Sequence, residues 1–148
     1  MHDAAAAAWH AMYRLVFEGE GQQRFHEACD ALGLAPGILK ALLQLTPGAP
    51  QPMRELAARF RCDPSYVTSL VDGLEQAGLA ERRSHPADRR VRMVALSRSG
   101  ERALAQVLAI LAEPPSAFAA LSSGELRTLR ALLGKILQAA EPASGLDG

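Results

Sequence analysis

The chain has 148 residues, the usual size of one domain, and its 16 basic and 16 acidic residues give a formal net charge of zero. Hydrophobic residues make up 49% of it and aromatic residues only 5%, which favours a mostly helical protein with a core of leucine, alanine and valine. No apolar run approaches the ~20 residues that span a bilayer, and no secretory signal opens the chain, so a cytoplasmic protein without membrane contact is expected.

The N-terminal quarter of the chain predicts helix. Apolar residues recur at helical spacing from Trp9 to Phe17. The Gly19-Glu20-Gly21 stretch weakens a helix, so Asp3 to Ala31 is expected either as one bent helix or as two abutting helices. Gly33 is the expected stop.

The next segments predict two short helices separated by a loop. Proline favours the first helical turn, so a helix is expected to begin at Pro36. Three prolines between Thr46 and Pro52 cannot continue that helix and predict a loop. An apolar face at helical spacing between Met53 and Phe60 predicts the second helix.

A helix from Pro64 to Gln76 is the candidate recognition element. Asp63 is its expected N-cap and Gly78 its expected C-terminal cap. Its buried stripe is predicted to be Val67, Leu70, Val71 and Leu74. The outward side chains of its first turns are mostly small and hydroxyl-bearing, and the major groove of DNA admits a helix whose N-terminal residues touch base edges. The candidate base-reading residues are Ser65, Tyr66, Thr68 and Ser69, although an ordinary solvated helix face shows the same pattern.

The hydrophobic period then changes from helix to strand. Leu79 to Arg83 and Arg90 to Leu96 predict a β-hairpin, with burial on both faces near the end of the second strand. Ser97 is expected to cap a further helix that runs to about Ala112. The S-x-x-E capping box from Ser122 to Glu125 predicts the start of the last helix, and residues 141–148 are expected to form a frayed tail.

Charge is unevenly distributed along the chain. The segment from Arg54 to Arg102 holds ten arginines against seven acidic residues, and the remainder is net negative. A guanidinium suits phosphates and guanine edges, so this clustering predicts contact with nucleic acid.

The hairpin supplies the candidate wing residues. We expect Asp88 to hold one arginine extended through a bidentate pair, and the strand arginines to face phosphates; a surface ion-pair network is the alternative. The candidate wing residues are Arg82, Arg83, Asp88, Arg89, Arg90 and Arg92.

Five motifs together resemble the MarR (multiple antibiotic resistance regulator) family. They are DPSYVTSLVDGLEQAGL at 63–79, ER at 81–82, PADRR at 86–90, VALSRSG at 94–100 and LSSGEL at 121–126. The resemblance covers most of the chain and is densest between Met53 and Gly100.

The resemblance implies a winged helix-turn-helix regulator that binds short pseudo-palindromic DNA as a homodimer, usually as a repressor. It implies a recognition helix in the major groove and a wing in the flanking minor groove. By position, Ser65, Thr68 and Ser69 match groove-reading residues, Arg90 matches the wing-tip arginine, and Asp88 matches the acid that orients it.

The predicted organisation is a single domain over 1–148. Residues 36–97 form the DNA-binding winged helix, and the helical regions 1–35 and 98–140 form the dimerisation region. The apolar stripes from Trp9 to Phe17 and from Leu126 to Leu137 exceed what so small a winged domain can cover, which independently favours pairing across a two-fold axis. Packing of these helices on their own subunit is the alternative.

The sequence says least about the signal that would release the protein from DNA. Members of the family are released from DNA by small, often phenolic ligands or by cysteine oxidation. By analogy, we expect a small aromatic ligand between the dimer helices and the winged domain. The candidate lining is Trp9, His10, Tyr13, Phe17, Leu39 and Leu43, each of which would equally serve as core.

The cysteines and histidines form no metal-ligand spacing, so neither a metal nor a cofactor is expected. Cys29 is a redox candidate because His26, one turn away, would favour its thiolate, whereas a small buried hydrophobe is the simpler interpretation. Cys62 is interpreted as a packing residue.

Two other functional classes stay open. A non-specific architectural DNA binder would use the same clustered arginines, and a winged helix can also bind protein. An enzyme is not expected, because the sequence contains no recognisable nucleophile–base pair, paired carboxylates or phosphate-binding loop.

Overall fold

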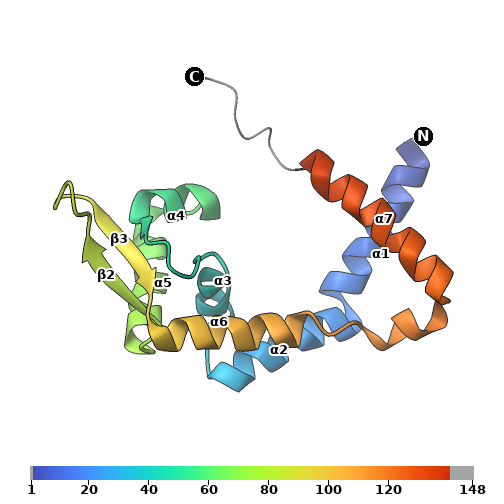
Figure 1. Cartoon of the computed structure of the whole chain (residues 1–148), viewed down its shortest axis with the longest axis horizontal. Coiled ribbons are helices and arrows are strands. Elements are labelled where there is room, and N and C mark those ends of the chain that lie inside the picture. The colour runs from blue at the N-terminus through green and yellow to red at the C-terminus, as the bar shows by residue number, and fades with distance from the viewer. Residues whose placement is uncertain (1, 141–148) are drawn as a thin grey trace. The chain divides into compact units, whose positions relative to one another are not determined.

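The computed structural model describes residues 2–140 (Figure 1). The chain divides into two compact units, Met1–Glu113 and Pro114–Gly148, which are described separately below. The predicted organisation as one domain therefore stays a prediction. No helix in the described residues is long and apolar enough to cross a membrane.

The first unit begins with two consecutive helices, α1 (His2–Phe17) and α2 (Gly19–Leu32). The break falls at Glu18, which is extended, and Gly19 then adopts a φ of 57°, a conformation that favours glycine. A side chain at Gly21 would overlap the carbonyl oxygens of Leu15 and Val16, so this glycine permits the close approach of the two helices. Of the two arrangements expected for this segment, the structure has the two abutting helices.

Four further helices surround the core of the first unit: α3 (Pro36–Leu42), α4 (Met53–Phe60), α5 (Pro64–Gln76) and α6 (Arg98–Leu111). Helix α5 packs against α3 and α4, and α6 lies along α2 (Figure 1). The predicted stripe of α5 is buried and meets Leu39, Leu42 and Leu56, which are also fully buried. The local patterns therefore predicted the helices and the core face of α5 correctly.

A small antiparallel sheet completes the first unit. Its strands are β1 (Gln51–Pro52), β2 (Ala80–Ser84) and β3 (Arg92–Leu96), in the order β1-β3-β2. Two expectations are corrected here. Part of the predicted loop at 46–52 forms the edge strand β1, where Pro52 needs no ladder N–H.

The second correction concerns the hairpin. Strand β3 begins at Arg92, because Arg90 and Val91 belong to a turn closed by hydrogen bonds from Val91 N to Asp88 O (3.0 Å) and from His85 N to Val91 O (3.0 Å). The end of β3 is buried on both faces, as predicted.

The second unit contains a short 3-10 helix, η1 (Ser116–Ala120), and helix α7 (Ser123–Ala140). The predicted capping box is present: the backbone N–H and the hydroxyl of Ser122 both donate to Glu125 Oε2, at 2.8 and 2.7 Å. The apolar stripe of α7 is largely solvent-exposed, with Leu132, Ile136 and Leu137 each more than half exposed.

Candidate nucleic-acid interface

The N-terminus of α5 is held by its predicted cap. Asp63 Oδ1 accepts hydrogen bonds from the backbone N of Ser65 (2.8 Å) and from its hydroxyl (2.7 Å). These bonds lower the pKa of Asp63 below its ordinary value of 3.8, so the carboxylate stays charged at neutral pH. The cap fixes the direction in which the helix leaves the preceding turn.

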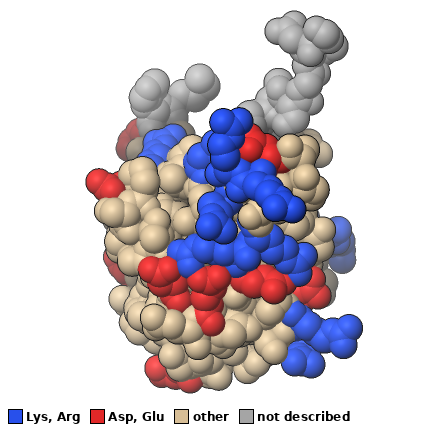
Figure 2. Space-filling model, turned by 90° about the vertical axis from the view of Figure 1, so that its left-hand side faces the viewer, with Lys and Arg blue, Asp and Glu red and all other residues tan. Residues whose placement is uncertain are grey.

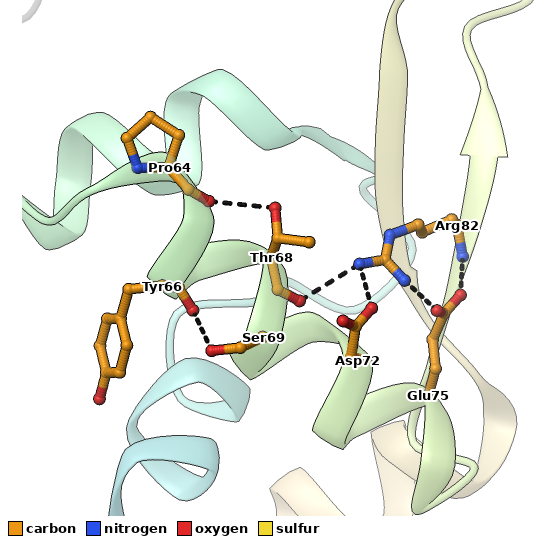
Figure 3. Close-up of polar contacts among 7 residues, drawn as sticks. All are labelled: Pro64, Tyr66, Thr68, Ser69, Asp72, Glu75 and Arg82. Carbon is orange, nitrogen blue, oxygen red and sulfur yellow. Dashed lines mark hydrogen bonds and ion pairs between the residues drawn. The ribbon is translucent and has the colours of Figure 1, made fainter.

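The hydroxyls on the exposed face of α5 are bound to their own helix. Thr68 donates to Pro64 O (3.0 Å) and Ser69 donates to Tyr66 O (2.7 Å), as Figure 3 shows. Each hydroxyl oxygen keeps a free lone pair, so in this state the face presents hydrogen-bond acceptors.

Tyr66 lies apart from the other predicted base-reading residues. Its ring points away from Thr68 (Figure 3), and its hydroxyl approaches Gly37 in α3, where an added Cβ would lie 3.1 Å away. The side chain is nevertheless half exposed. The structure thus brings Ser65, Thr68 and Ser69 onto an exposed surface and turns Tyr66 toward α3.

The wing tip presents Arg90 in an ordered turn. Asp88 Oδ1 accepts from both the backbone N (3.0 Å) and the guanidinium Nε (3.3 Å) of Arg90, whose side chain is 92% exposed. The expected pair therefore exists, but a single carboxylate oxygen accepts both bonds, so it is not a two-oxygen fork. Arg89 and Arg92 are also exposed.

Two of the predicted phosphate-facing arginines are engaged within the protein. Arg82 binds the carboxylates of Asp72 and Glu75 on α5. Arg83 forms an ion pair with Glu81 within β2 and stays largely exposed. The Arg82 side chain therefore points toward α5 and its two carboxylates (Figure 3), and the expected contact with phosphate stays a prediction.

The face that carries the wing is strongly basic. Figure 2 shows Lys and Arg side chains gathered into one patch on this face, with Asp and Glu side chains along one edge. Arg54 on α4 and Arg61 in the turn after it are also exposed; both belong to the charge cluster of the sequence but were not among the candidate interface residues. In a helix-turn-helix the first helix crosses the DNA backbone. The place of α4 directly before α5 in the sequence is therefore the signal by which these two arginines could have been predicted as phosphate contacts.

The candidate ligand-lining residues lie in different environments. Leu39 is fully buried and Leu43 packs on the same core, whereas Trp9, Tyr13 and Phe17 are exposed on α1. His10 is exposed as well. Tyr13 and Phe17 contact each other, with their ring centroids 5.0 Å apart.

The two cysteines differ in exposure. Cys29 is buried, and this burial raises its pKa, with a smaller contribution from Asp30, so the thiol form is favoured over the reactive thiolate. Cys62 is exposed and donates to Phe60 O, which corrects its interpretation as a packing residue. Within residues 2–140, no group of three His, Cys, Asp or Glu side chains is placed to hold a metal ion.

Comparisons with known proteins agree with this geometry. The MarR family profile matches residues 38–91, from within α3 to the turn that precedes β3. The transcriptional regulator BilQ of Clostridium symbiosum (strain WAL-14163) is 32% identical over 107 residues, which cover 70% of this chain and 73% of BilQ.

Solved structures show the same fold. YusO from Bacillus subtilis is 26% identical with a TM-score of 0.64, and the match covers 94% of this chain and 96% of YusO. The MepR protein of a MepR–DNA complex from S. aureus is 20% identical with a TM-score of 0.64, over 82% of this chain and 93% of that one, and it supports the fold alone. With its hydroxyl-bearing helix, its arginine wing and a regulator as a relative, the chain belongs to the MarR family of winged helix-turn-helix transcriptional regulators.

Proposed function

We propose that this regulator is a repressor that binds a pseudo-palindromic operator as a homodimer. The observation that carries the proposal is the pairing of an exposed, hydroxyl-bearing α5 face with a wing whose Arg90 side chain is 92% exposed. A helix of this kind suits the major groove, and an extended arginine suits the strongly negative minor groove. The structurally similar MepR protein of S. aureus was solved in a complex with DNA. The proposal assigns the protein no catalytic step, and it places the protein in the cytoplasm, on the nucleoid when bound.

The test is binding of the purified protein to the DNA upstream of its own gene, beside a scrambled duplex of equal length, at two salt concentrations. The proposal expects tight, salt-sensitive binding to the upstream DNA and a preference of at least ~1000-fold over the scrambled duplex. Equal binding to both duplexes would instead support the non-specific architectural alternative. Binding to neither would support a protein-binding module.

Dimerisation is supported by the exposed apolar faces of α1 and α7. Trp9, Val16 and Phe17 on α1 are each more than half exposed, as are Ile136 and Leu137 on α7. Such surfaces are costly to leave in water, and a second copy is the partner that two-fold symmetric DNA requires. Ile136→Glu should shift the mass measured by light scattering from dimer to monomer, whereas Gln138→Glu, a matched new charge on the same helix, should leave the dimer intact. A monomeric wild type would overturn this part of the proposal.

Release by a small aromatic ligand is the remaining part of the proposal. The exposed rings of Trp9, Tyr13 and Phe17 support it, since aromatic side chains commonly line such sites. Phenolic compounds should quench the fluorescence of Trp9, the single tryptophan, and lower operator affinity over the same concentration range. Quenching without any loss of operator affinity would count against a regulatory site. Oxidation of Cys29 is the less supported signal, because that thiol is buried.

A further inference from the structure

Arg82 connects the wing to the recognition helix through several contacts at once. Its guanidinium lies 2.6 Å from Asp72 Oδ1 and 3.3 Å from Thr68 O, and it pairs closely with Glu75 Oε2 (Figure 3). Its backbone N donates to Glu75 Oε1 at 2.9 Å. Because β2 is an edge strand, this last bond satisfies an N–H that the sheet leaves unpaired.

The chemistry of the contact requires arginine. A guanidinium carries five N–H donors in a rigid plane and can bridge two carboxylates and a carbonyl together, which a lysine ammonium on a flexible stem does poorly. The Arg82 side chain is only 23% exposed, so its interactions are less screened by water than those of a fully exposed pair.

The neighbouring ion pairs do not connect the same elements. Glu81 with Arg83, and Asp88 with Arg90, are each two residues apart and hold the hairpin only to itself. Among residues 2–140, the ion pairs between α5 and the wing are those of Arg82.

We propose that Arg82 is a positioning residue that fixes the wing on the recognition helix and thereby sets operator specificity. The inference rests on the proposed function. Thr68 and Ser69 in the major groove and Arg90 in the minor groove reach their targets together only if the hairpin keeps one orientation relative to α5. Arg82 holds that orientation from inside the protein and offsets one of the two carboxylate charges of α5, so it makes no phosphate contact of its own.

The proposal predicts that removing negative charge near the DNA lowers operator affinity, whereas charge repulsion alone predicts that affinity rises. The double variant Asp72→Asn/Glu75→Gln removes two negative charges near DNA and frees Arg82. If Arg82 were a restrained phosphate contact, operator affinity would rise and the slope of log affinity against log salt would steepen by about 1.8, which is about 0.9 for each subunit of the proposed dimer. If Arg82 positions the wing, operator affinity falls about tenfold, the size of one lost base contact, while affinity for a scrambled duplex stays equal or rises.

The matched control is Glu81→Gln, which also removes a carboxylate from an arginine pair but leaves the α5–wing contact intact. Its operator affinity should be equal to or higher than that of the wild type. Arg82→Lys should lose specificity in the same direction as the double variant, because lysine cannot bridge both carboxylates. Tighter operator binding by the double variant would overturn the proposal, as would a loss of specificity in Glu81→Gln as large as in the double variant.

A measurement without DNA separates this inference from the proposed function. Hydrogen exchange of the backbone amides of 80–84 should speed up in the free Asp72→Asn/Glu75→Gln protein and in Arg82→Lys, and stay unchanged in Glu81→Gln. If the wild type shows no operator preference, the proposed function fails. The exchange rates of the 80–84 amides would still test whether Arg82 fixes the wing on α5. Unchanged exchange in both network variants would overturn the positioning role.

Discussion

Asp88 and Arg90 are joined through a single atom: the Oδ1 of the aspartate accepts from both the backbone N–H and the guanidinium Nε of the arginine. The bond from the backbone N–H of Arg90 ties the aspartate side chain into the turn, and the bond from the guanidinium directs an arginine side chain that is 92% exposed. The acid therefore shapes the tip in addition to offsetting its charge. This arrangement gives the aspartate a structural role within an arginine-rich wing.

Replacing Arg90 with alanine should weaken operator binding by about 10- to 100-fold and lower the salt slope by about two, because the proposed homodimer loses one arginine–DNA contact in each subunit. Fluorescence anisotropy at several salt concentrations gives both quantities. The control is Arg14→Ala, which removes an exposed arginine from an ion pair on α1, away from the wing. An Arg90→Ala protein that binds the operator with wild-type affinity and slope would exclude the wing tip from the interface.

Gly100, in the first turn of α6, should not accept a methyl group. A Cβ there would overlap the carbonyl oxygen of Leu79, which already accepts a hydrogen bond from Ser97 N at 3.0 Å. Gly100→Ala should therefore reduce the free energy of unfolding by about 2 kcal/mol, as overpacking typically does. Gly124→Ala, in the first turn of α7 where an added Cβ would meet nothing closer than 3.9 Å, should raise it by about 0.5 kcal/mol through helix propensity. Chemical denaturation followed by circular dichroism measures both, and equal effects of the two changes would contradict the close approach at Gly100.

The Asp63 cap should contribute a pH-dependent part of the stability. Hydrogen bonds from Ser65 lower the folded-state pKa of Asp63 below 3.8, so this stabilisation is present above the unfolded-state pKa and is lost as pH falls through the folded-state value. Asp63→Asn should flatten the dependence of unfolding free energy on pH below about pH 4. Ser65→Ala should have an intermediate effect, because the backbone N–H of residue 65 still donates to Asp63. Identical pH dependence of the unfolding free energy in wild type and Asp63→Asn would show that the pKa of Asp63 does not differ between the folded and unfolded states.

Thiol reactivity should separate the two cysteines. Cys62 is exposed in the turn before α5, whereas Cys29 is buried and its pKa is raised. Timed alkylation followed by mass spectrometry should show modification of Cys62 at least about tenfold faster than that of Cys29. In Cys62→Ser, the remaining thiol should react slowly until denaturant is added. Fast alkylation of Cys29 in the folded protein would contradict this prediction and support a redox role for Cys29.

The sequence by itself determined the features that depend on residues close along the chain. The caps at Asp63, Ser97 and Ser122 follow from side chains that bond backbone groups two or three positions away. The buried stripe of α5 follows from helical periodicity. A pair between Asp88 and one wing arginine was also predicted, and the family resemblance implied Arg90 as that arginine; the two-oxygen fork expected for it is replaced by a single shared oxygen.

Tertiary structure alone decided which of the wing arginines is bound within the protein. Arg82 looks like its neighbours in sequence, but its position on β2 places it beside carboxylates that lie seven and ten positions away on α5. Likewise, Gln51–Pro52 becomes a strand only because Met93 and Val94 lie opposite it. An ion pair or a strand pairing between distant segments depends on where the fold brings each backbone, and local periodicity carries no information about that distance.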